Sequence, residues 1–183
     1  MPCFHGCMST MATPQPITNA LLQESIVNSV QNVCRTMMGH DATLQEAVPG
    51  SHLESLGPLP HVIGSVGFAG QANGLLYLCL SMDFAKKAAE QILGMSSNEI
   101  AMHGHEVVMD AIGELTNMMT GGFKNALCDV GYPCKLSLPS IVRGENLTIA
   151  SIKPGSRHIY RFLCNGQKLT TDIQIKESSP PAG

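Results

Sequence analysis

The sequence predicts a single α/β domain of the α+β type, in which long helices pack on a mostly antiparallel sheet. Two long apolar stripes at helical spacing predict the helices, and strand-like runs joined by short turns predict the sheet. The chain has 183 residues, which is enough for one domain with a sizeable core. We expect this domain at residues 17–177, between a flexible leader at residues 1–16 and a disordered tail at residues 178–183.

The composition excludes several classes of function. Charged residues make up only 14% of the chain, and its 11 basic side chains form no run of the kind that binds nucleic acid. No apolar stretch approaches the roughly 18 residues of a membrane span, and no secretory signal is evident. We therefore expect a cytoplasmic protein that binds neither nucleic acid nor a membrane.

Familiar catalytic and metal-binding motifs are missing. The seven Cys include no CxxC pair, and the sequence lacks a phosphate-binding loop, a dinucleotide-binding loop and a nucleophile elbow. We expect reduced thiols, no metal site and no covalent catalysis.

The first half of the chain predicts two helices around a hairpin. Gly39 and Gly94 are typical helix stops, and a stretch rich in Pro and Gly separates the first helix from the hairpin. The expected elements are a helix at residues 19–38, mostly loop at 40–60, strands at 62–68 and 75–81, and a helix from a cap at Asp83 to Gly94.

The second half predicts one long helical stretch followed by strands. Ser96 and Glu99 have the spacing of a capping box, which predicts a helix start. The expected elements are a helix reaching toward Leu127 with a bend at Gly121-Gly122, and strands at residues 135–142, 147–152, 157–163 and 168–176, the last two joined by an Asn165-Gly166 turn.

An internal pseudo-repeat is indicated by the two long helices. Polar residues and a Gly recur at an offset of 82 positions, and strands follow each helix. The first set is Glu24, Asn28, Asn32, Arg35 and Gly39, and the second is Glu106, Asp110, Glu114, Asn117 and Gly121.

The second of these helices carries a row of polar residues on one face. At about 100° per residue, Asp110, Glu114, Asn117 and Gly121 fall within about 60° of arc. Gly113 and Gly121 flank the row, and small residues there leave room for another protein's surface. A helical Asn is unfavourable, but its amide can orient water with one donor and one acceptor. Apolar side chains lie on the opposite face: Val108, Ile112, Leu115, Met119 and Ala126.

Asp110, Glu114 and Asn117, followed by Pro139 after 21 intervening residues, resemble the signature of the CheX and CheC chemotaxis phosphatases. Residues 110–117 are similar to that family's active-site helix throughout. The resemblance also covers the order of the other elements, over most of residues 19–176.

This resemblance implies a phosphatase that stimulates hydrolysis of aspartyl phosphate on a CheY-like response regulator. It implies that Glu114 pairs with a lysine of the receiver domain and that Asn117 holds the attacking water in line. Asp110, Gly113 and Gly121 would lie against the partner. Phosphoryl transfer depends chiefly on positioning and charge stabilisation. Because the receiver supplies its own Mg²⁺, no cofactor is expected in this chain.

The first helix departs from the signature, because Asn28, Asn32 and Arg35 occupy the equivalent row. One active site per chain is more similar to CheX, whose members are dimers, so we expect a homodimer. One alternative is a non-catalytic module that binds a response regulator, as in flagellar switch proteins. A second is a structural dimer whose polar row is only solvated, since any amphipathic helix has a charged face.

Overall fold

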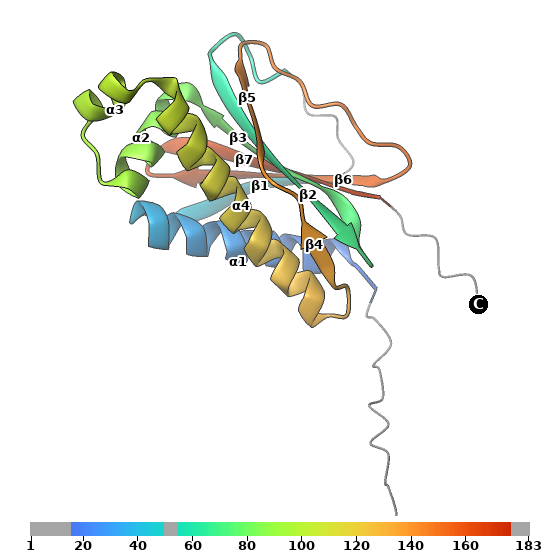
Figure 1. The fold of residues 1–183 in the computed structure, drawn as a ribbon. Helices are drawn as coiled ribbons and strands as arrows, with labels where there is room; N and C mark the ends of the chain where they lie inside the picture. Colours follow the sequence, from blue (N-terminus) through green and yellow to red (C-terminus); the bar gives the residue numbers. More distant parts are fainter. Residues whose placement is uncertain (1–15, 50–54, 177–183) are drawn as a thin grey trace, which may run out of the picture.

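Four helices cover one face of a seven-stranded sheet in the computed structural model, which describes residues 16–49 and 55–176 (Figure 1). The predicted leader, apart from residue 16, and the predicted tail lie outside these residues, so the domain limits stay predictions. The elements are α1 (Asn19–Met38), β1 (Ala42–Pro49), β2 (His61–Gly70), β3 (Asn73–Ser81), α2 (Met82–Leu93), α3 (Ser97–His103), α4 (His105–Asp129), β4 (Cys134–Leu136), β5 (Ser140–Gly144), β6 (Ser156–Cys164) and β7 (Gln167–Lys176).

Every strand pair among the described residues is antiparallel, which confirms the predicted class of sheet. The strand order is β1-β6-β7-β3-β2-β4, and β5 also pairs with β2. The two halves of the chain exchange edge strands, because β1 pairs with β6 while β4 and β5 pair with β2. This arrangement is compatible with the pseudo-repeat on α1 and α4, which stays a prediction.

The helix limits follow the capping residues. α1 spans the predicted residues and ends at Gly39, whose φ of 68° is left-handed. α2 ends at Gly94 as predicted, but its N-cap is Ser81, whose hydroxyl accepts a hydrogen bond from the Phe84 amide at 3.2 Å. Asp83 lies in the first turn instead.

The predicted long helical stretch is two helices. The capping box of Ser96 and Glu99 is present and opens α3. Gly104, with a φ of 78°, then separates α3 from α4. α4 continues without interruption through Gly121 and Gly122, so the break lies at Gly104 rather than at the paired glycines.

Two strand assignments are wrong. β1 lies inside the predicted loop at residues 40–60, and residues 147–152 form no strand. The apolar side chains Leu147 and Ile149 instead pack on the sheet face away from the helices, against a cluster that includes Ile63 and Ile159. These residues therefore form a segment that covers this face of the sheet without pairing as a strand.

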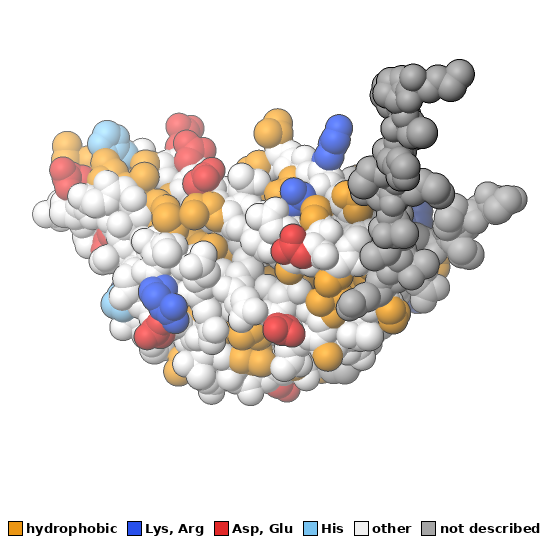
Figure 2. Space-filling model, turned by 90° about the horizontal axis from the view of Figure 1, so that it is seen from below, with side chains coloured by type: hydrophobic (Ala, Val, Ile, Leu, Met, Phe, Trp, Pro, Cys, Tyr) orange, Lys and Arg blue, Asp and Glu red, His pale blue; other side chains and the backbone are white. Residues whose placement is uncertain are grey.

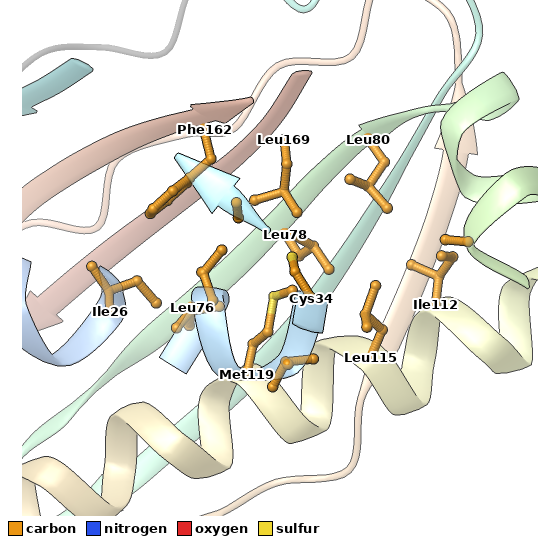
Figure 3. Close-up of a cluster of buried hydrophobic side chains, with 14 of the residues drawn as sticks. Ile26, Cys34, Leu76, Leu78, Leu80, Ile112, Leu115, Met119, Phe162 and Leu169 are labelled. Carbon is orange, nitrogen blue, oxygen red and sulfur yellow. The ribbon is translucent and has the colours of Figure 1, made fainter. Parts of the chain in front are cut away.

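The main core lies between the sheet and the helices α1 and α4 (Figure 3). Both helices contribute buried aliphatic side chains that meet those of the central strands. The labelled side chains in Figure 3 are Ile26, Cys34, Leu76, Leu78, Leu80, Ile112, Leu115, Met119, Phe162 and Leu169.

Candidate functional site

The polar row predicted on α4 faces away from the core. Asp110 and Glu114 are exposed and Asn117 is half-buried, whereas Ile112 and Leu115 on the other side of the helix are fully buried. Within residues 16–49 and 55–176, the side chains of Asp110, Glu114 and Asn117 form no hydrogen bond or ion pair. The carboxylate and the amide, one turn apart, are therefore free to bind a partner.

α4 packs closely on strand β2. The buried hydroxyls of Thr116 and Thr120 are satisfied within the helix, where they donate to the Ile112 carbonyl at 2.7 Å and to the Thr116 carbonyl at 2.8 Å. Gly64 of β2 allows the close approach, because a Cβ atom at that position would lie 2.1 Å from Thr116 Oγ1. Any larger residue at position 64 would displace the helix, and with it the polar row.

α1 fixes the same helix from a second direction. The Ser29 hydroxyl donates to the Met119 carbonyl of α4 at 2.7 Å, and this bond is buried. Gly122 has no side chain to obstruct it, since a Cβ atom there would lie 2.3 Å from Ser29 Oγ. The row that contains Asn117 is thus held on a helix anchored by both the sheet and α1.

Gly113 does not offer space to a partner, which corrects the interpretation made from the sequence. It is buried, and a Cβ atom there would lie 3.7 Å from Ile141 and 3.8 Å from Pro139 Cγ. The space beside Gly113 is filled by the segment around β5 of the same chain. Pro139, part of the sequence signature, therefore packs directly beside the row that contains Glu114.

Gly121 does leave open space, since no atom lies within 4 Å of a Cβ built there. It lines a groove of about 780 Å³ between α1 and α4, next to the position of Asn117. Figure 2 shows the face of the molecule on which α1 lies, where most of the surface is uncharged. The groove lining also includes Glu24, Asn28, Asn32, Met118, Gly122 and Asn125.

The equivalent row on α1 has a different chemistry. Asn28 and Asn32 are exposed and face the groove. Arg35 is paired with Asp41, with Nε 3.0 Å from Oδ1. Because α1 presents no carboxylate followed by an amide at the spacing of Glu114 and Asn117, only α4 carries the predicted pair.

The described residues contain no group of three or more His, Cys, Asp or Glu that could hold a metal ion. The five cysteines among them are free. Burial raises the pKa of the Cys34 and Cys79 thiols well above the ordinary value, so both stay protonated and unreactive. As for membranes, none of the helices described is long and apolar enough to span one.

Comparison with known proteins first gives the class. A CheC-like superfamily protein from Shewanella sp. PV-4 has the same fold, with a TM-score of 0.74 and 28% identity, over 87% of this chain and 100% of that one. The CheX–CheY–BeF₃–Mg²⁺ complex from Borrelia burgdorferi also matches, with a TM-score of 0.69 and 21% identity, over 85% and 98% of the two chains. The fold is therefore that of the CheC-like proteins.

The family follows from the sequence. The family model described as "Chemotaxis phosphatase CheX" matches residues 62–163, which are more than half of the chain. The CheY-P phosphatase CheX of Thermotoga maritima is 27% identical over 135 residues, covering 73% of this chain and 82% of the relative. The chain belongs to the CheX family of chemotaxis phosphatases, as its α4 signature indicated.

Proposed function

We propose that this protein stimulates hydrolysis of aspartyl phosphate on a CheY-like receiver domain. The observation that carries the proposal is the outward-facing pair of Glu114 and Asn117, one turn apart on a helix that packs on β2 and is hydrogen-bonded to α1. The relative from T. maritima, named a CheY-P phosphatase, and the CheX bound to CheY in the B. burgdorferi structure support the choice of partner.

In this proposal the two side chains have separate roles. The Glu114 carboxylate pairs with a lysine of the receiver and so docks the two proteins in register. The Asn117 amide donates one hydrogen bond and accepts another, which orients a water molecule toward the phosphorus. Water attacks, the bond between phosphorus and the aspartyl oxygen breaks, and the products are inorganic phosphate and the free aspartate. Asp110 and Gly121 lie in the surface that meets the receiver.

The receiver supplies the remaining chemistry. Its Mg²⁺ and lysine neutralise the charge on the phosphoryl oxygens, which is the main requirement of phosphoryl transfer. This chain then needs neither a nucleophile nor a cofactor of its own. That division of labour stays a prediction, as does the cytoplasmic location.

The test is the lifetime of a phosphorylated receiver. We expect this protein to shorten that lifetime catalytically for at least one member of a panel of CheY-like receivers, and Glu114→Gln to lower kcat/KM on the order of tenfold through weaker docking. Glu145→Gln removes an exposed carboxylate from the loop after β5 and is the matched control. Tight binding of a beryllofluoride-loaded receiver with no shortening of its lifetime would instead favour a non-catalytic binding module.

We also propose that the protein is a homodimer, as the resemblance to CheX implied. Light scattering at micromolar concentration should then give about twice the chain mass of 19.5 kDa. A monomer mass under these conditions would contradict the proposal, while leaving the phosphatase site on α4 unaffected.

A further inference from the structure

Leu138 is the most exposed of the large hydrophobic side chains in the described part of the chain. It is 89% exposed and lies on the segment that connects β4 to β5. Figure 1 shows this connection running alongside α4, the helix that carries the polar row. A single exposed leucine is ordinary on a protein surface, so the position of Leu138 beside α4, and not its exposure alone, bears on function.

The backbone around Leu138 is fixed in place. The Ser137 amide donates to the Gly67 carbonyl at 2.8 Å, and the Gly67 amide donates to the Ser137 hydroxyl at 2.9 Å. The Ser137 hydroxyl in turn donates to the Leu138 carbonyl at 2.9 Å. Pro139 restricts the backbone of Leu138, the residue before it, and β5 begins at Ser140. The backbone at Leu138 is therefore held in place, so little backbone entropy is lost when a partner covers the side chain.

The same segment borders the proposed site. Pro139 Cγ lies 3.8 Å from the Cβ position of Gly113, which directly precedes Glu114 in the helix. Gly113 also lies one turn before Asn117, on the side of the row that faces away from the α1–α4 groove. The β4–β5 connection therefore borders the row on one side, and the α1–α4 groove borders it on the other.

We infer that Leu138 is an apolar contact for the receiver domain, buried by its surface when Glu114 and Asn117 engage the phosphorylated site. This inference rests on the proposed function and extends it by adding a residue that sets affinity and partner choice. Beside the charged Glu114 and the polar Asn117, Leu138 adds apolar area to an otherwise polar interface. Leu138 takes no part in the chemistry, so it acts on binding alone.

The experiment compares Leu138→Ser, Leu138→Met and wild type on a receiver whose dephosphorylation the wild type stimulates. We expect Leu138→Ser to raise KM about tenfold with kcat and melting temperature unchanged, since burial of a leucine side chain accounts for a factor of that size. Leu138→Met keeps most of the apolar area and should remain close to wild type. Leu59→Ser removes a leucine that is 67% exposed in the segment before β2, and it is the control expected to change neither KM nor melting temperature.

Three results would overturn the inference. A KM for Leu138→Ser equal to that of wild type would do so while leaving the proposed function intact. A fall in kcat alone, or a lower melting temperature, would show that the side chain supports catalysis or folding rather than docking. A wild-type protein with no effect on any receiver in the panel would overturn both the inference and the function on which it rests.

Discussion

Alanine in place of Asn117 is expected to lower kcat for receiver dephosphorylation roughly a hundredfold or more, because an attacking water held in line accounts for a factor of that order. Binding of a beryllofluoride-loaded receiver should change little, since Glu114 and Leu138 remain. Single-turnover phosphate release gives kcat, and titration of the loaded receiver gives the affinity. Phosphate release that survives the substitution would refute the role in water positioning.

The same substitution should not weaken the fold. Asn117 forms no hydrogen bond or ion pair within the described ranges, and asparagine is a poorer helix former than alanine by about 0.5 kcal/mol. We therefore expect a melting temperature equal to or slightly above that of wild type. Asn98→Ala, at an exposed position of α3, is the matched control and should leave kcat unchanged. A clear loss of stability in Asn117→Ala would mean that its effect on rate is structural.

Replacing Arg157 with methionine should produce the largest loss of stability. The guanidinium contacts the Asp172 carboxylate across β6 and β7, with Nη2 2.5 Å from Oδ2, and the two side chains are 6% and 0% exposed. Without Arg157, Asp172 is left as an uncompensated buried charge, which costs about 3–5 kcal/mol in the free energy of unfolding. Urea denaturation measures this loss, and adding Asp172→Leu should recover most of it.

A matched control lies on the same strand. Arg161 pairs with Glu46 on the surface, where both side chains are about half exposed. Because solvent weakens such pairs, Arg161→Met should change the free energy of unfolding by less than about 1 kcal/mol. Equal losses for Arg157→Met and Arg161→Met would contradict the argument from burial.

The loss of unfolding free energy in Arg157→Met should also depend on pH. Burial raises the pKa of Asp172, and Arg157 opposes that rise. With Arg157 gone, the pKa rises further, so the folded state takes up a proton more readily than the unfolded chain does. The loss of unfolding free energy is therefore greatest above the pKa of Asp172 in the folded state, and it disappears below the pKa of Asp172 in the unfolded chain. Urea unfolding curves measured between these two pKa values should show the stability of the variant approaching that of wild type as the pH falls.

Local signals in the sequence located most helices and hairpins. Gly39 and Gly94 end helices because they adopt a left-handed backbone, and Asn165-Gly166 forms its tight turn with φ values of 47° and 70°. Each of these features depends on neighbouring residues only. The same holds for the row from Asp110 to Asn117, whose outward direction follows from helical periodicity.

The sequence does not predict features that depend on contacts between residues far apart in the chain. β1 is an edge strand whose residues, such as Thr43 and Glu46, are mostly exposed, and a bulge between Leu44 and Glu46 interrupts the alternation on which strand prediction relies. Residues 147–152 alternate like a strand, but their backbone bonds to the Gln174 side chain, with the Ile152 amide 2.6 Å from its Oε1.

The surroundings of the site also required the structure. The sequence does not show that Pro139 and Ile141 cover Gly113, so it predicts open space there. The exposure of Leu138 likewise does not follow from a continuous strand at residues 135–142. The sequence signal that could have found it is the interruption Ser137-Leu138-Pro139, which breaks the strand beside α4.

The exchange of edge strands makes each half of the chain depend on the other. A chain cut between α2 and α3 would separate β1 from β6 and β2 from β4 and β5, so neither fragment could complete the sheet alone. α1 still supports α4 through the hydrogen bond from Ser29, although its own outer face carries no pair like Glu114 and Asn117. Substitutions on the outer face of α1 should therefore leave the α4 site intact, provided that the Ser29 hydrogen bond to α4 is kept.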